Sequence, residues 1–242
     1  MPYSNDKHEM TIPAGCPWYE AQQTLGAPNV NWCEDTQCTW INEPANTWSN
    51  LGYILVGVYI LKKLQQSHLR LFGWVVIVMG AFSFIYHATN NFFTQTLDFV
   101  GMFLMMSFLF SFHFKRVRPT WGSNFFVTFW FFMFLNTFIF LCFGIFNQPV
   151  QMIMLMNAVP IMALDIIAGT REGHLKEYKY FILSTVLLIV AQGFAIMDIQ
   201  RIYCQPHNLW LHGHVIWHLL GGLAMLFAGL HMEKMMKLKQ SN

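Results

Sequence analysis

The chain has 242 residues, of which 11% are charged and 55% are hydrophobic, with 24 Phe and 16 Met. An ordinary soluble domain has about 25% charged residues, so this composition predicts an integral membrane protein and excludes a disordered chain. The formal net charge of +2 is too small to indicate a nucleic-acid partner, and five Cys are too few for a disulfide scaffold.

Residues 1–46 are polar and predict an extramembrane amino-terminal cap. The chain that follows is predicted to be all-α, because it contains runs of about 20 apolar residues, which suffice to cross a bilayer core about 30 Å thick. We predict a bundle of seven transmembrane helices within residues 47–233 and a cytoplasmic tail at 234–242. In chain order the helices cover about 47–64, 70–90, 96–114, 121–145, 150–169, 179–200 and 211–233.

The basic residues predict how this bundle is oriented. In the seven-helix arrangement, 12 of the 14 Lys and Arg residues fall on one side, and only Lys7 and Arg201 fall on the other. Cytoplasmic loops carry an excess of Lys and Arg, so we predict that the amino terminus is outside or lumenal and the carboxy terminus cytoplasmic. The 12 residues are Lys62, Lys63, Arg70, Lys115, Arg116, Arg118, Arg171, Lys176, Lys179, Lys234, Lys237 and Lys239.

Four ionisable side chains are predicted to lie at one depth, near the outer face. The second span ends outside at His87, whereas the third span begins outside with Asp98 and the seventh with His214 and His218. Ionisable groups inside a membrane are costly and usually functional. His214 and His218 are four residues apart and share one helix face, a spacing that suits a metal chelate.

Together these residues predict a catalytic metal centre. His87 would be the third protein ligand of a zinc ion whose fourth position stays open for water, as in catalytic zinc sites. Ser83 lies one turn before His87 and would face the same cavity, and Asp98 would orient a ligand or carry a proton. Each group alone has a simpler explanation: Asp98 as a helix cap, Ser83 as a helix-packing residue.

Four short motifs resemble the alkaline ceramidase family, from about residue 31 to 233. They are Trp32-Cys33-Glu34, Asn46-Thr47-Trp48-Ser49-Asn50, Ser83-x3-His87-Ala88 followed by Gln95-x-Leu97-Asp98, and His214-x2-Trp217-His218. The resemblance implies a seven-helix, zinc-dependent amidase that cleaves ceramide, a membrane lipid, into a sphingoid base and a fatty acid. It implies zinc on His87, His214 and His218, with Ser83 and Asp98 in the chemistry.

The same resemblance implies a calcium site in the cap, with ligands from Asn31, the Trp32 carbonyl, Glu34, Thr36 and Glu43. This sequence departs from the family there, because Asn31 stands where Asp is usual and Thr36 where Asn is usual. The resemblance also implies a disulfide between Cys33 and Cys204.

Three alternative functions stay open at this point. A hydrolase of another lipid amide or ester would use the same site. A receptor of the adiponectin type, which belongs to the same superfamily, would have a cytoplasmic amino terminus, opposite to the basic-residue pattern. A haem-binding electron carrier needs only two facing histidines and would show a Soret absorbance. The sequence favours neither the endoplasmic reticulum nor a bacterial envelope, and it does not predict the oligomeric state.

Overall fold

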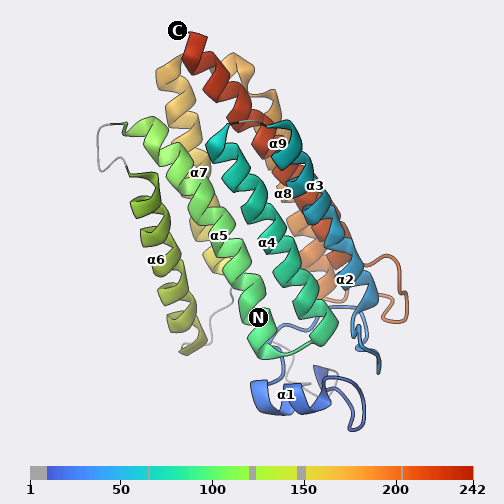
Figure 1. Ribbon diagram of the computed structural model, residues 1–242. Coiled ribbons are helices and arrows are strands. Elements are labelled where there is room, and N and C mark those ends of the chain that lie inside the picture. The colour runs from blue at the N-terminus through green and yellow to red at the C-terminus, as the bar shows by residue number, and fades with distance from the viewer. Residues whose placement is uncertain (1–9, 65, 120–123, 146–150, 203, 242) are drawn as a thin grey trace. The chain divides into compact units, whose positions relative to one another are not determined.

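The computed structural model describes residues 10–64, 66–119, 124–145, 151–202 and 204–241. Within these ranges every regular element is a helix and none is a strand, so the predicted all-α class is confirmed for them (Figure 1). Chain contacts separate two compact units. The first comprises Met1–Gly101 and Tyr180–Glu233, and the second comprises Met102–Lys179 and Lys234–Asn242.

The cap belongs to the first unit and is described from residue 10 onward, so that Lys7 lies outside the described residues. It contains the short helix α1 (Tyr19–Leu25) and a disulfide between Cys16 and Cys38. The buried side chain of Gln22 accepts a hydrogen bond from the backbone N–H of Ile12 at 2.8 Å and donates to the carbonyl of Asn90 at 2.7 Å. This single amide therefore ties the cap to the residue that follows helix α4.

The first predicted span, 47–64, forms two helices rather than one. Helix α2 (Pro44–Ser49) and helix α3 (Leu51–Lys63) are separated by Asn50. The 13 residues of α3 extend for about 20 Å at 1.5 Å per residue, which is shorter than a bilayer core of about 30 Å. The count of seven spans therefore stays a prediction.

Helix α3 packs closely on helix α4 (Ser67–Thr89) because small residues face each other there. A Cβ atom added at Gly57 would lie 2.5 Å from a side-chain carbon of Ile77 and 2.7 Å from the carbonyl oxygen of Gly73. One added at Gly80 would lie 2.8 Å from the Cβ of Tyr53. Glycine at such positions lets two helix backbones approach closely.

Helix α5 (Phe92–Val117) begins four residues before its predicted start at residue 96. The side-chain oxygen of Asn91 accepts a hydrogen bond from the backbone N–H of Thr94 at 3.1 Å, which is the geometry of an N-terminal cap. The sequence did not predict this cap, because the residues after it, Thr94 to Asp98, are mostly polar. The first ten residues of α5 belong to the first unit.

The first unit also contains helix α8 (Lys179–Ile199) from Tyr180 onward and most of helix α9 (Gly213–Ser241). The Ser184 hydroxyl joins the two helices by donating to the carbonyl of Ala224 at 2.9 Å. Helix α9 continues through residues 234–241, which the sequence analysis assigned to a tail.

The second unit contains the rest of α5, helices α6 (Phe125–Ile145) and α7 (Gln151–Glu172), and the short 3-10 helix η2 (Leu175–Glu177). The predicted spans 121–145 and 150–169 both begin at residues outside the described part of the chain. Two buried amides, Asn136 and Asn157, hydrogen-bond to each other at 2.7 and 3.2 Å. Near the end of α5, Arg116 forms ion pairs with Asp165 and, at 2.6 Å, with Glu172.

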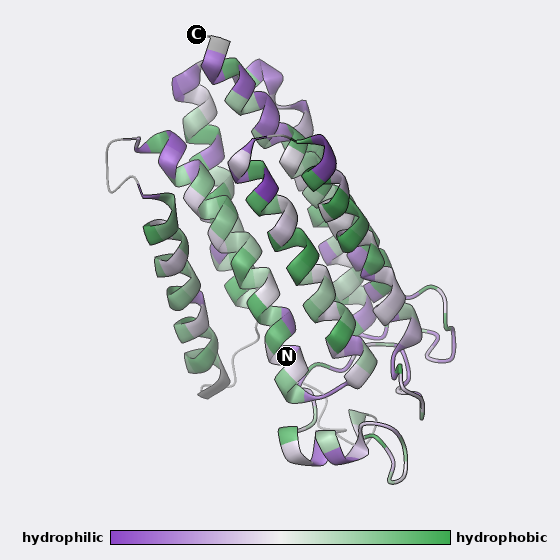
Figure 2. Cartoon of the chain, viewed as in Figure 1, coloured by the Kyte–Doolittle hydropathy of each residue, from purple (hydrophilic) through white to green (hydrophobic). Residues whose placement is uncertain are grey.

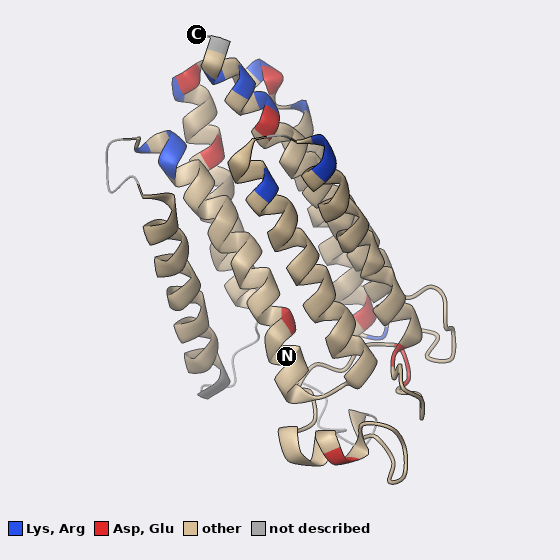
Figure 3. Ribbon diagram, in the orientation of Figure 1, with Lys and Arg blue, Asp and Glu red and all other residues tan. Residues whose placement is uncertain are grey.

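Six of the described helices are long and apolar enough to cross a membrane, as expected of a multi-pass membrane protein. Figure 2 shows apolar residues along most of their length, and Figure 3 shows charged residues concentrated near helix ends. Basic residues occur in the last turns of α3, α5 and α7. The six are Ser67–Thr89, Phe92–Val117, Phe125–Phe143, Met152–Glu172, Lys179–Ile199 and Gly213–Gln240.

Candidate metal centre

Three buried histidines of the first unit come together. His87 is in the last turn of α4, and His214 and His218 are in the first turns of α9. Each has a ring nitrogen within 4.8 Å of a ring nitrogen of the other two, and Nε2 of His87 is 3.1 Å from Nε2 of His214. The three side chains are almost completely inaccessible to solvent. This grouping can hold one metal ion by three imidazole nitrogens.

Two of the rings are oriented by hydrogen bonds at Nδ1. Nδ1 of His87 lies 2.6 Å from Oε2 of Glu43, and Nδ1 of His218 lies 2.7 Å from the hydroxyl of Ser49. Metal-binding histidines characteristically donate their second ring N–H to such an oxygen, which fixes the ring and leaves the other nitrogen for the metal. In both residues that other nitrogen is Nε2, so the ring orientations fit a metal site.

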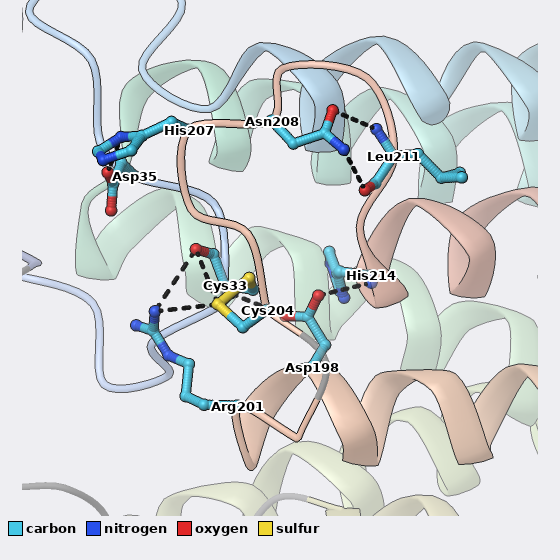
Figure 4. Close-up of a disulfide and its surroundings, with 9 residues drawn as sticks. All are labelled: Cys33, Asp35, Asp198, Arg201, Cys204, His207, Asn208, Leu211 and His214. Atoms are coloured by element: carbon cyan, nitrogen blue, oxygen red, sulfur yellow. Dashed lines mark hydrogen bonds and ion pairs between the residues drawn. A yellow bond between two sulfur atoms is a disulfide. The ribbon is translucent and has the colours of Figure 1, made fainter.

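The third ring, His214, is held by its backbone and by stacking. The carboxylate of Asp198, near the end of α8, accepts hydrogen bonds from the backbone N–H groups of His214 at 2.9 Å and of Cys33 at 2.8 Å (Figure 4). The indole of Trp32 stacks on the His214 ring, with centroids 3.5 Å apart and planes inclined by 27°. Asp198 thus joins the cap to the start of α9.

A disulfide between Cys33 and Cys204 lies next to this contact (Figure 4). It links the cap to the segment between α8 and α9. A second grouping of potential metal ligands consists of Cys33, Asp198 and His212. Because the Cys33 sulfur is in the disulfide, it is not available as a thiolate, and this grouping is not a metal site of the usual kind.

Ser83 and Asp98 also lie in the first unit, and the hydroxyl of Ser83 is near the carboxylate of Asp98. Ser83 is buried on α4, one turn before His87, whereas Asp98 is half-buried on α5. Since α5 begins at Phe92, Asp98 is in its second turn, not in the first turn as the sequence analysis had it. Asn91 occupies the capping position, which removes the explanation of Asp98 as a helix cap.

The residues predicted to bind calcium lie around α2, where two carboxylates are buried. The two carboxylate oxygens of Glu34 accept hydrogen bonds from the backbone N–H groups of Ala45 and Asn46, each at 2.8 Å. The hydroxyl of Thr36 accepts a hydrogen bond from Asn90 at 2.8 Å, and Asn31 and Trp32 are half-buried. Calcium at this place stays a prediction, because both Glu34 oxygens already have donors.

Burial is the main reason why the pKa values of these two carboxyl groups are high. Burial, with the Glu43 carboxylate nearby, raises the pKa of Glu34 to about 8, while the hydrogen bonds from Asn46 and Ala45 act in the opposite direction. Burial also raises the pKa of Glu43 to about 8, opposed by the hydrogen bond from the Asn46 side chain. A nearby cation would favour the ionised form of both groups.

Comparison with known proteins identifies the family to which the chain belongs. A protein-family model described as Ceramidase matches residues 26–242. The chain belongs to the ceramidase family. An alkaline ceramidase of Drosophila melanogaster is 27% identical to this ceramidase-family chain, in an alignment that covers 89% of this chain and 81% of that protein. The family match includes the three histidines, Ser83 and Asp98.

The sequence analysis did not assign the contacts that orient the histidines. It placed Glu43 in the calcium site and gave Ser49 no role beyond its motif, although the hydrogen bonds of these residues span 44 and 169 positions in sequence. The only available signal was the Asn-Thr-Trp-Ser-Asn motif, which contains Ser49. Trp32 was noted only as part of a motif and a carbonyl ligand, and its stacking on His214 was not foreseen.

Proposed function

We propose that this ceramidase-family chain hydrolyses the amide bond of ceramide to a sphingoid base and a fatty acid, with zinc bound by His87, His214 and His218. The observation that carries the proposal is the 3.1 Å separation between the Nε2 atoms of His87 and His214. Oε2 of Glu43 accepts a hydrogen bond from Asn46 at 3.0 Å and contacts Nδ1 of His87, so the ring proton of His87 belongs on Nδ1 when Glu43 is ionised, the form that a bound cation favours.

Nε2 of His87 therefore presents a lone pair to a second ring nitrogen inside a buried cluster. Such an arrangement is stabilised when a cation or a proton lies between the nitrogens. Neutral imidazoles are common zinc ligands, and three protein ligands with an open fourth position are typical of catalytic zinc. Bound zinc would polarise the amide carbonyl and lower the pKa of water to about 7.

Asp98 and Ser83 supply the proton transfer and the charge stabilisation. Asp98 accepts a proton from the water molecule whose oxygen attacks the carbonyl carbon. As the C–N bond breaks, Asp98 returns that proton to the departing nitrogen, so that the sphingoid base leaves as a neutral amine. Ser83 donates a hydrogen bond to the carbonyl oxygen while negative charge develops there. The proximity of Ser83 and Asp98 supports these roles, because both groups can then act on one substrate.

The finer features predicted from the sequence belong to the same proposal. They are seven spans with the amino terminus outside or lumenal, a catalytic domain at 47–233 between a cap and a tail, and calcium bound near Glu34 and Glu43. The 12-to-2 division of basic residues supports the orientation. The two buried carboxylates support the calcium site, since calcium prefers oxygen ligands.

The test combines metal analysis with product analysis on the purified full chain. We expect one zinc per chain, fatty-acid release from ceramide and no Soret absorbance. His218→Ala should lose zinc and activity while the circular dichroism of the helices is unchanged. Full zinc occupancy in that variant would contradict the ligand assignment. If fatty acid is released from another lipid amide or ester but not from ceramide, that lipid would replace ceramide as the proposed substrate.

A further inference from the structure

Ser49, the last residue of α2, has a hydroxyl that contacts two polar atoms, a backbone carbonyl and a ring nitrogen of His218. The hydroxyl donates to the backbone carbonyl of Asn46 at 2.9 Å, and a carbonyl can only accept. The same oxygen lies 2.7 Å from Nδ1 of His218. When the hydroxyl proton is directed toward Asn46, the oxygen offers a lone pair to His218, and Nδ1 of His218 carries the proton in that contact.

We propose that Ser49 is a positioning residue that holds His218 in the Nδ1–H tautomer. A neutral imidazole has one ring proton, so this tautomer leaves the lone pair on Nε2. The consequence for zinc rests on the proposed function, whereas the assignment of the tautomer does not. Ser49 thereby acts on His218 as Glu43 acts on His87, from the opposite end of the same short helix.

Helix α2 is held firmly enough for this role. Both carboxylate oxygens of Glu34 accept backbone hydrogen bonds from its first turn, and the backbone N–H of Thr47 donates to the carbonyl of Glu43 at 2.8 Å. The side chain of Asn50 donates to the same Asn46 carbonyl as Ser49 does, at 2.9 Å. Ser49 itself is 8% exposed. Its hydroxyl therefore has little freedom to turn away from His218.

The surroundings of Ser49 provide a matched control. Ser49 lines an apolar groove of about 450 Å³ together with Trp48, Val215, Leu219 and other residues. Ser49→Thr keeps the hydroxyl, and the added methyl group has space in this groove. Ser49→Ala removes the hydroxyl and leaves the helix backbone unchanged.

The first experiment measures zinc affinity by competition with a chromophoric chelator, without substrate. Removing a partner that orients a metal ligand typically costs about 10–100-fold in metal affinity. We expect Ser49→Ala to lose affinity in this range and Ser49→Thr to stay close to the parent, with similar melting temperatures for all three. Ser49→Ala with the affinity of the parent would overturn the proposal, as would an equal loss in both variants.

The second experiment needs neither zinc nor turnover. In metal-free protein labelled with 15N-histidine, the His218 signals are assigned by their loss in His218→Gln. We expect Nδ1 of His218 to be protonated in the parent and in Ser49→Thr, and the proton to be redistributed between the ring nitrogens in Ser49→Ala. A parent His218 protonated at Nε2 would refute the assignment. A parent that binds no zinc or cleaves no ceramide would refute the proposed function, while this spectrum still decides the role of Ser49.

Discussion

Helix α5 is capped by Asn91, whereas the sequence alone did not show whether Asp98 caps this helix or has another role. Asn91 caps α5 through the backbone N–H of Thr94, and Asp98 lies a further turn along the helix with its carboxylate near Ser83. An acidic side chain in the second turn contributes little to the cap, because the unsatisfied backbone N–H groups are those of the first turn. The position of Asp98 next to Ser83 is therefore compatible with the proton transfer that we propose for it.

We predict that Asp98→Asn keeps zinc and thermal stability but loses ceramide hydrolysis by about two orders of magnitude or more, the typical range of general acid–base catalysis. Asparagine has a similar shape but no carboxylate that can take up a proton. Fatty-acid release, zinc content and the melting temperature would be measured together. Ser83→Ala is the companion variant, and it should lose rate without losing zinc. Hydrolysis by Asp98→Asn at nearly the parent rate would show that Asp98 is structural.

The candidate metal ligands could be predicted from the sequence better than the residues that orient their rings. The grouping of His87, His214 and His218 followed from helix polarity and the i, i+4 spacing, both of which can be derived from one sequence. The contacts of Glu43 and Ser49 with the rings depend on how α2 is placed against α4 and α9, and no periodicity encodes that placement. The position of Asn50 between two helices was also not predicted, because the polar residues that precede the apolar run are equally compatible with the first turn of a single helix.

At the scale of helices, the contact between α3 and α4 depends on the absence of side chains. We predict that Gly57→Ala destabilises the protein by about 1–3 kcal/mol, as is typical when atoms are forced into a packed interior. The added methyl group would lie 2.5 Å from Ile77 and 2.7 Å from the Gly73 carbonyl. The melting temperature in detergent would be measured.

The matched control is Gly193→Ala in α8, where an added Cβ meets no atom within 4 Å. Alanine is favoured over glycine in a helix interior by about 0.5–1 kcal/mol, so this variant should be neutral or slightly stabilised. If both substitutions shift the melting temperature equally, close packing of α3 on α4 does not depend on Gly57.

For the whole chain, the predicted orientation can be tested without any assay of activity. We predict that an epitope tag placed before residue 1 is accessible from outside, or from the lumen of vesicles, and that a tag after residue 242 is accessible only from the cytoplasm. The physical reason is the division of basic residues between the two sides. Antibody labelling of intact and permeabilised membranes would be compared. An amino-terminal tag reached only from the cytoplasm would favour the receptor-type topology.

The two disulfides should contribute unequally to stability and to the metal site. The Cys33–Cys204 bond joins residues 171 positions apart, and the Cys16–Cys38 bond joins residues 22 apart. A crosslink that closes a longer loop restricts the unfolded chain more. We predict a larger fall in melting temperature for Cys33→Ser with Cys204→Ser than for Cys16→Ser with Cys38→Ser. Only the first pair should also weaken zinc binding, because Cys33 shares Asp198 with the backbone of His214. Equal effects of the two pairs on zinc would contradict this link.

Two of the three candidate ligands lie on α9, far along the chain from the third, and this has a consequence for biosynthesis. His214 follows His87 by 127 residues, which a ribosome adds in roughly 6–25 s at about 5–20 residues per second. Throughout that interval the nascent chain contains only one of the three imidazoles. The proposed zinc site therefore cannot be completed until α9 has been synthesised and has reached α4.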